Sequence, residues 1–221
     1  MINWFGPASC TKEITGCLCE QSSGVLAQPS NAISAIAFLV VAFVLLVQYK
    51  KERWVWGYAL ALVGVGIGTA YYHATMTFLG QTIDFGGMNF VILLGLFYYL
   101  ARATRAEKRP LVWLGYWASV ALSAASLVWA PVLRRPLFAV MIAAVLYCYL
   151  VDPKRLTVPE TRRKLIRGLA VFLFGFVLWN LDNLSAFCWP NNPVQLHAIW
   201  HVCGAIASYY LFAAAVSVRK R

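Results

Sequence analysis

Residues 30–53 read SNAISAIAFLVVAFVLLVQYKKER, an almost uninterrupted apolar run that is followed at once by a cluster of basic residues. The apolar part, residues 30–49, has the length of about 20 residues that an α-helix needs to cross a hydrocarbon core of about 30 Å. The rest of the chain has the same character, since 61% of its 221 residues are hydrophobic and only 12% are charged. A soluble domain needs a more polar surface than this, so the sequence predicts an integral membrane protein.

Further apolar runs of spanning length follow along the chain. Together with the first they occupy residues 30–49, 54–74, 82–102, 111–130, 134–151, 165–185 and 195–217. We therefore expect an all-α, polytopic membrane protein with seven transmembrane helices, built as a single domain over residues 1–221. Residues 1–29 are polar, contain cysteines and lack the pattern of a cleaved signal peptide, so they are expected to remain as an N-terminal segment outside the membrane.

The basic residues lie in short clusters at alternate joints between the predicted spans. Sixteen of the nineteen Lys and Arg follow the first, third, fifth or seventh span, whereas Lys12, Arg134 and Arg135 fall on the opposite side. Cytosolic loops are enriched in Lys and Arg, so the N-terminus is predicted to lie outside (periplasm, lumen or exterior) and the C-terminus in the cytosol. These clusters differ from the basic stripe of a nucleic-acid-binding fold, and we predict neither a nucleic acid nor a protein partner.

The three histidines of the chain map to one end of the predicted bundle. His73 ends the second span, while His197 and His201 open the seventh, so the topology places all three near the outer face. A spacing of four residues puts His197 and His201 on one side of a helix, one turn apart. Three imidazoles with a fourth position open to water are typical of a catalytic zinc site, in which the pKa of the water falls to about 7.

An acidic residue and a hydroxyl lie close to these histidines in the predicted topology. Asp84 starts the third span at its outer end, after a tight turn that follows His73. An unpaired carboxyl group in hydrocarbon costs several kcal/mol, so Asp84 is a candidate partner of the histidines or a proton shuttle. Thr69 precedes His73 by one helical turn and shares its face. Its hydroxyl is a candidate for stabilising an oxyanion, with a bond to its own helix carbonyl as the structural alternative.

A second acidic residue, Asp182, lies near the outer end of the sixth span between Asn180 and Asn183. A direct contact with the metal is one interpretation. A hydrogen-bonded polar network that ties helices together is the interpretation we favour.

Four cysteines map to the outer side, where the redox conditions permit disulfides: Cys10, Cys17, Cys19 and Cys188. A bridge between the N-terminal segment and the connection after the sixth span is therefore expected. Four cysteines allow three pairings, and spacing alone does not choose among them.

The polar elements of the spans follow one another in a characteristic order. They are TAYYH at residues 69–73, Asp84, LWNLDN at residues 178–183 and HAIWH at residues 197–201. This pattern resembles the alkaline ceramidase family, within a superfamily of seven-helix membrane hydrolases that includes adiponectin-receptor-like proteins. The resemblance covers nearly the whole chain. The receptor-like branch is expected to have a cytosolic N-terminus, so the charge pattern points to the ceramidases.

The resemblance implies hydrolysis of a lipid amide, with zinc supplied as the cofactor. His73, His197 and His201 would hold the metal, Asp84 would relay protons, and Thr69 would take the place of the family's usual Ser. The lipid would enter sideways from the bilayer and leave as a fatty acid and a free amine. The family precedent for the amine is a sphingoid base, although other N-acyl lipids contain the same bond.

The resemblance also implies a disulfide between Cys19 and Cys188, with no role assigned to Cys10 and Cys17. Eukaryotic members resemble calcium binders in the N-terminal segment, where they use several carboxylates. Only Glu20 keeps a carboxylate in the matching stretch here. A hard cation prefers charged oxygens, so calcium is expected to bind weakly or not at all.

Two other functions are compatible with the same residues. In a receptor or sensor the metal would only tie helices together, so its loss would unfold the bundle and no lipid would be consumed. A proton or ion carrier would use Asp84 and Asp182, but both lie at the outer end and the midplane has no titratable relay.

Overall fold

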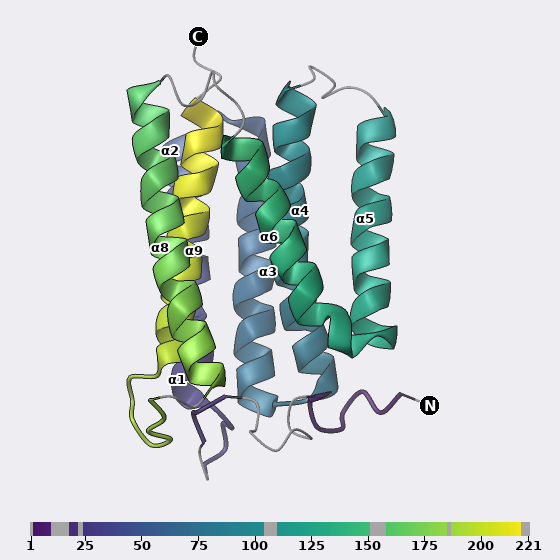
Figure 1. Cartoon of the computed structure of the whole chain (residues 1–221), viewed down its shortest axis with the longest axis vertical. Coiled ribbons are helices and arrows are strands. Elements are labelled where there is room, and N and C mark those ends of the chain that lie inside the picture. The colour runs from purple at the N-terminus through teal and green to yellow at the C-terminus, as the bar shows by residue number, and fades with distance from the viewer. Residues whose placement is uncertain are drawn as a thin grey trace.

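The computed structural model describes residues 2–9, 18–21, 24–103, 110–150, 158–184 and 187–217. Within these residues the chain forms an upright bundle of helices and no strand, apart from an isolated bridge between Pro7 and Thr77 (Figure 1). The helices are α1 (Pro29–Ser34), α2 (Ile36–Tyr49), α3 (Arg53–Thr75), α4 (Phe78–Ala103), α5 (Pro110–Trp129), the short 3-10 helix η2 (Pro131–Leu133), α6 (Arg134–Leu150), α8 (Pro159–Asn183) and α9 (Leu196–Ser217).

Six of the described segments are long and apolar enough to cross a membrane, with α1 and α2 acting as one segment. The remaining long helix, α6, has 17 residues and is shorter than these six segments. Its first two residues are arginines. These helices confirm the prediction of an all-α, multi-pass membrane protein. Helices α4 and α8 begin at Phe78 and Pro159, before the predicted apolar runs. The first turns of α8 are helical but charged, and α4 follows directly on the turn at Met76.

The helices pack in pairs along most of their length. The pair α8 and α9 runs side by side, and α3 lies between α2 and α4. A Cβ atom at Gly175 of α8 would lie 2.6 Å from the Cβ of Cys203 in α9, so only glycine permits this close approach. Helix α5 packs mainly on α4 at the edge of the bundle (Figure 1).

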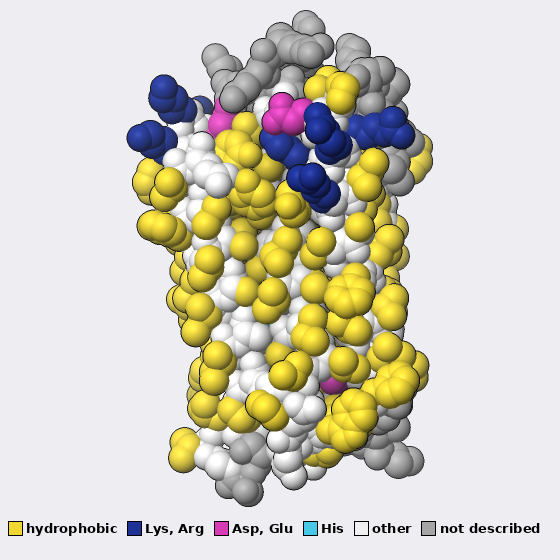
Figure 2. Space-filling view, turned by 90° about the vertical axis from the view of Figure 1, so that its left-hand side faces the viewer, with side chains coloured by type: hydrophobic (Ala, Val, Ile, Leu, Met, Phe, Trp, Pro, Cys, Tyr) yellow, Lys and Arg dark blue, Asp and Glu magenta, His cyan; other side chains and the backbone are white. Residues whose placement is uncertain are grey.

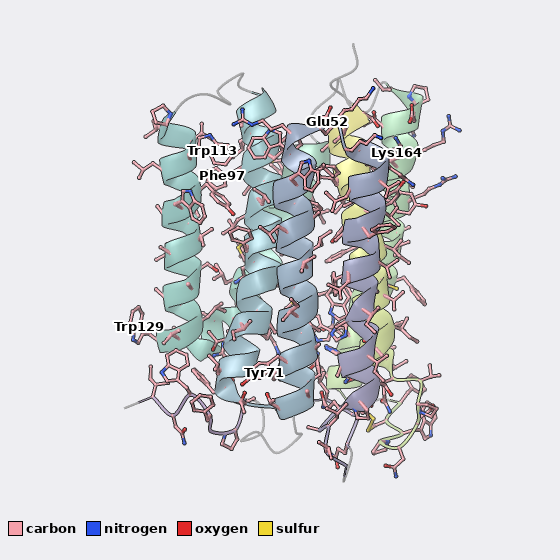
Figure 3. The ribbon with its side chains drawn as sticks, turned by 180° about the vertical axis from the view of Figure 1, so that it is seen from behind. Glu52, Tyr71, Phe97, Trp113, Trp129 and Lys164 are labelled. Carbon is pink, nitrogen blue, oxygen red and sulfur yellow. A yellow bond between two sulfur atoms is a disulfide. The ribbon has the colours of Figure 1, made fainter. Side chains whose placement is uncertain are left out.

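The outer surface of the bundle matches a lipid environment. Figure 2 shows hydrophobic side chains over the height of one face, with Lys and Arg gathered near one end. Trp113 and Trp129 lie at opposite ends of α5 (Figure 3), as expected for aromatic residues at the two membrane interfaces.

The described basic residues at the joints confirm part of the charge pattern in space. Lys50, Lys51 and Arg53 adjoin the start of α3, and Arg162, Arg163, Lys164 and Arg167 lie in the first turns of α8, which is the same end of the bundle (Figures 2 and 3). Lys12, Arg105, Lys108, Arg109, Lys154, Arg155, Arg219, Lys220 and Arg221 lie outside the described residues. The orientation relative to the membrane stays a prediction.

The described parts of the N-terminal segment, residues 2–9, 18–21 and 24–28, lie over the opposite end of the bundle and are bonded to its loops. The backbone N–H of Ala8 donates to the carbonyl of Met76, in the turn between α3 and α4, over 2.9 Å. The backbone N–H of Gln21 donates to Pro190, in the connection between α8 and α9, over 3.3 Å. Met76 itself adopts a left-handed conformation (φ 49°) that ends α3 and lets the chain turn sharply into α4. The segment therefore forms a cover over the end where α3 finishes and α9 starts.

Candidate metal centre

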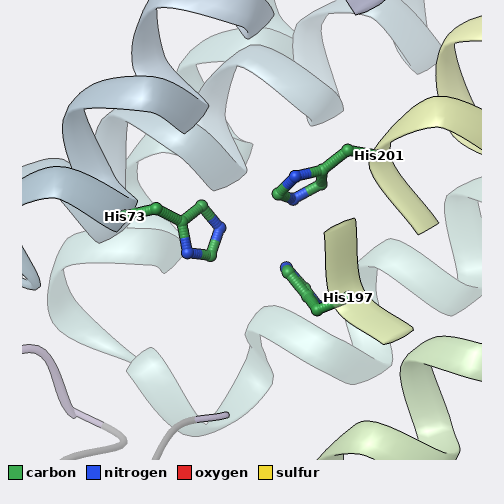
Figure 4. Close-up of side chains that lie close together, drawn as sticks. All are labelled: His73, His197 and His201. Carbon is green, nitrogen blue, oxygen red and sulfur yellow. The ribbon is translucent and has the colours of Figure 1, made fainter. Parts of the chain in front are cut away.

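Two helices bring the three histidines together at the covered end of the bundle. His73 is in the last turn of α3, and His197 and His201 are in the first two turns of α9. Their side chains are 0, 6 and 4% exposed. One ring nitrogen from each lies within 4.8 Å of the others, and the imidazoles converge on a common point (Figure 4). The structure thus forms a buried group that could bind a metal ion.

Hydrogen bonds to α1 and the residue before it fix the orientation of two of the rings. The Nδ1 of His73 lies 2.7 Å from the side-chain Oε1 of Gln28, and the Nδ1 of His201 lies 3.2 Å from the backbone carbonyl of Asn31 and 2.8 Å from the hydroxyl of Ser34. A carbonyl oxygen can only accept, so each Nδ1 carries the proton and each Nε2 keeps its lone pair. The lone pairs are therefore left for another ligand.

The chemistry of this group fits a divalent metal such as zinc. The Nε2 of His73 and the Nδ1 of His197 are buried with no hydrogen-bond partner among the described residues. Buried polar atoms are normally paired, and two such nitrogens beside a third imidazole form a set of neutral donors. Three imidazoles favour zinc and related borderline metals over calcium or magnesium, which prefer oxygen.

Glu20 stabilises the part of the chain that orients the histidines. Its two carboxylate oxygens accept the backbone N–H groups of Ser30 and Asn31 over 2.6 and 2.9 Å, at the start of α1. A carboxylate at this position satisfies unpaired N–H groups and interacts favourably with the helix dipole. The side-chain amide of Gln28 also donates to the backbone carbonyl of Glu20 over 3.0 Å. Glu20 thus caps α1 in this structure, and its behaviour toward calcium stays a prediction.

Asp84 and Thr69 form a buried pair next to the histidines. The hydroxyl of Thr69 donates a short hydrogen bond to the Oδ1 of Asp84. Asp84 lines the same cavity as His197 and His201. In this arrangement the proton of Thr69 is directed at the carboxylate, so the threonine orients Asp84. The roles of both residues in catalysis stay predictions.

Two cavities meet at the histidines. The outer cavity, of about 310 Å³, has a mixed lining in which apolar side chains accompany charged and polar ones such as Asp84, His197, Arg134 and Arg135. The inner cavity, of about 110 Å³, is mostly apolar and runs along α9 from His201 toward Ala215. Met88, Phe138, Trp200 and His201 line both cavities. A molecule that occupies both must pass the histidines.

The predicted polar network around Asp182 is only partly interconnected. Asp182 accepts the backbone N–H of Cys19 over 3.1 Å, which ties α8 to the N-terminal segment. The side-chain amides of Asn180 and Asn183 donate to carbonyls of their own helix, and Asn183 also accepts from Arg135 over 3.2 Å. The bonds with Cys19 and Arg135 join α8 to its neighbours, but among the described residues no hydrogen bond joins Asn180, Asp182 and Asn183 to one another.

A disulfide joins Cys19 to Cys188, the pair that the resemblance favoured. It connects the N-terminal segment to the connection between α8 and α9, beside the bond that Asp182 makes. Cys10 and Cys17 lie outside the described residues.

Sequence reasoning did not find the residues that orient the histidines. Gln28, Asn31 and Ser34 were not assigned to the metal centre. The available signal was their spacing, because Gln28, Asn31 and Ser34 recur every three residues and so lie along one face of a short helix.

Comparisons with known proteins point to one family. A sequence model of the family described as Ceramidase matches residues 18–220. An alkaline ceramidase from Drosophila melanogaster is 23% identical over 85% of this chain and 70% of the relative. An alkaline ceramidase from Arabidopsis thaliana is 27% identical over 94% of this chain and 83% of the relative, and alkaline ceramidase 3 from Mus musculus is 23% identical over 93% and 82%.

Proposed function

The chain belongs to the ceramidase family, and from this premise we propose that it is a zinc-dependent membrane hydrolase. It cleaves the amide bond of ceramide or a related N-acyl lipid and releases a fatty acid and a free amine. The whole chain acts as one seven-helix domain, with the active site near the outer face of the membrane. The observation that carries this proposal is the buried group of His73, His197 and His201 at the junction of a polar and an apolar cavity.

The three histidines would hold the zinc ion. When bound there, zinc supplies a Lewis acid for the amide carbonyl and lowers the pKa of water enough to make a nucleophile available at neutral pH. Gln28, Asn31 and Ser34 hold the rings of His73 and His201 in the orientation that directs their Nε2 atoms inward. Such outer partners raise the basicity of the ligands and keep the site in shape.

Asp84 is the proton carrier of the proposed reaction. Its carboxylate takes the proton of the attacking water and passes it to the nitrogen of the leaving amine, which makes the amine a better leaving group. Thr69 holds the carboxylate in place through its hydrogen bond. Burial of both side chains keeps bulk water from competing for these protons.

The two cavities determine the orientation of the bound substrate. The acyl chain lies in the apolar inner cavity, and the amine side faces the polar outer cavity. The scissile amide then lies beside His201, which lines both. The lipid reaches this position sideways from the bilayer.

The test is release of fatty acid from ceramide and a panel of other N-acyl lipids by detergent-purified protein with its metal content recorded. We expect wild type to cleave an amide and His197→Ala to lose both metal and activity. Asp84→Asn should keep the metal, but its kcat should fall by roughly 10²–10⁴-fold. The control is Glu160→Gln, which changes an exposed carboxylate in the first turn of α8, at the opposite end of the bundle, and should retain both metal and turnover. A folded, zinc-loaded wild type that cleaves no amide in the panel would refute the hydrolase and favour a receptor with a structural metal.

A further inference from the structure

The outer cavity contains a buried cation that the proposed reaction does not use. Arg134, the first residue of α6, lines this cavity and is only 3% exposed. Its guanidinium donates to the hydroxyl of Ser9 over 3.0 Å, to the side-chain oxygen of Gln81 and to the carbonyl of Leu127 over 2.7 Å. It also lies 4.8 Å from the ring centre of Phe78. All of these partners are neutral.

A guanidinium keeps its charge in proteins, and burying a charge without an opposite one is costly. Among the described residues Arg134 forms no ion pair with a carboxylate. Hydrogen bonds to neutral oxygens satisfy its donors but do not compensate its charge. An anion that enters the cavity is therefore attracted to the charge of Arg134.

Arg135 adds a second positive charge at the rim of the same cavity. It is exposed, and its Nη2 donates to the side-chain oxygen of Asn183 over 3.2 Å. The charged residues among the described lining are these two arginines and Asp84, so the cavity is positive even without a metal. A sphingoid base, the amine product expected from ceramide, is protonated and would be repelled there.

We propose that Arg134 and Arg135 form a subsite for an oxyanion on the amine side of the substrate, a carboxylate or a phosphate. This inference rests on the proposed function, because the inner cavity takes the acyl chain and so leaves the outer cavity to the group beyond the amide nitrogen. The preferred substrates are then N-acyl lipids with an anionic head group, with neutral ceramide as the poorer substrate. Arg135 donates charge-assisted hydrogen bonds to the oxyanion, and Arg134, whose N–H groups are already used, attracts it by its positive charge.

Matched substrates test the charge preference directly. N-palmitoylglycine and its methyl ester differ only in the carboxylate, and ceramide 1-phosphate and ceramide with the same acyl chain differ only in the phosphate. We expect wild type to prefer the charged member of at least one pair by about tenfold or more in kcat/KM. The pair that shows the preference identifies the anion. Equal values within both pairs would overturn the inference while leaving the hydrolase intact.

Arginine variants separate anion binding from a structural role. Arg135→Gln should lower the preference for the charged substrate about threefold. Arg134→Gln should abolish the preference, and Arg134→Lys should restore part of it because the charge returns without the planar fork. Arg167→Gln, an exposed arginine at the opposite end of the bundle, is the control and should change nothing. Equal losses on both members of a pair in the Arg134 and Arg135 variants would show that these residues only support the fold.

A binding measurement keeps the test independent of turnover. In a ketone analogue of N-palmitoylglycine a methylene replaces the amide N–H, so it cannot be cleaved. The free acid should raise the Tm of the metal-loaded wild type more than its methyl ester does, and Arg134→Gln should remove that difference. If this difference is seen but no amide is cleaved, the hydrolase proposal fails and the anion subsite stands. Equal stabilisation by acid and ester would refute the subsite.

Discussion

Gln28 orients a metal-binding ring through its side-chain oxygen. Its Oε1 lies 2.7 Å from the Nδ1 of His73, which fixes the tautomer and the direction of the ring. Changing Gln28→Leu removes the acceptor, so we expect zinc affinity to fall by about 10–100-fold. Gln28→Glu should retain the affinity, because a carboxylate accepts the same hydrogen bond. Competition with a chromogenic chelator measures the change.

The control for this prediction is Gln48→Leu, the same substitution at the opposite end of the first span. Gln48 is exposed and bonds to Tyr209, far along the helices from the histidines. The zinc affinity of the Gln48→Leu protein should equal that of wild type. A Gln28→Leu protein with unchanged affinity would mean that packing alone orients His73.

Thr69 offers a test of how the carboxylate of Asp84 is held. Thr69→Val keeps the shape of the side chain but removes the hydrogen bond to Asp84, so kcat should fall by about 10–100-fold with metal content unchanged. Thr69→Ser keeps the hydroxyl and should recover most of the activity. Steady-state kinetics on the preferred lipid, with zinc measured in the same samples, gives the answer.

A matched change elsewhere controls for loss of a buried hydroxyl. The Oγ1 of Thr161 is buried without a hydrogen-bond partner among the described residues, so Thr161→Val should be neutral or stabilising and should not alter kcat. If Thr69→Val and Thr161→Val behave alike, the hydroxyl of Thr69 has no role in turnover.

The residues of the candidate site were predictable to different degrees. His197 and His201 were found because a spacing of four residues places two side chains on one helical face, and topology alone brought His73 to the same end. Gln28 was not assigned its role because it lies 45 residues before its partner His73, and no local pattern links residues so far apart. Arg134 was seen only as an exception to the charge rule, since its burial depends on how α6 packs against α4.

At the scale of elements, the length of the inner cavity sets a limit on the acyl chain. The cavity follows α9 from His201 to Ala215, about 21 Å at a rise of 1.5 Å per residue. Trp54 lines its far end, stacks on Trp113 with ring centres 4.8 Å apart, and packs at a tilt against Tyr98 with ring centres 4.9 Å apart. Trp54 and Tyr98 line this end of the cavity, so we expect the chain length of the preferred substrate to depend on them.

Changing Trp54→Leu should therefore extend the cavity and shift the preferred acyl chain to greater length. The loss of packing should also lower stability, because a large core side chain becomes a smaller one. Relative kcat/KM over a series of acyl lengths checks the shift. Trp113→Leu is the control, because Trp113 packs on the same cluster but does not line the cavity. A Trp54→Leu protein that is less stable but has an unchanged chain-length profile would contradict this limit.

The elements themselves were largely predictable, because each apolar run forms a helix whose length the hydrocarbon core dictates. The departures have local causes. The apolar run of the third span starts at residue 82, but α4 starts at Phe78 because the turn at Met76 lets the chain re-enter a helix at once. The polar first turns of α8 are helical for a similar reason, since Pro159 at its start favours helix initiation.

At the scale of the whole molecule, the two ends of the bundle differ in chemistry. One end contains the described basic joints, and the other contains the histidines, the covering segment and the disulfide between Cys19 and Cys188. Disulfides form and persist in oxidising compartments, and basic joints favour the cytosol. The two rules act on opposite ends and agree with each other, which supports the predicted orientation with the metal centre outside.

The disulfide should couple the cover to the metal centre. It closes a loop of 169 residues and holds Glu20 next to the start of α1, which in turn orients His73 and His201. A loop of that length corresponds to about 5 kcal/mol in the chain-entropy model, and the helices already restrict the chain, so the observed effect will be smaller. We expect Cys19→Ser with Cys188→Ser to lower Tm by several degrees and to accelerate zinc loss to a chelator. Reductant should have the same effect on wild type and none on the double variant. Identical Tm and zinc retention in reduced and oxidised wild type would show that hydrogen bonds alone, such as that from Cys19 to Asp182, hold the cover in place.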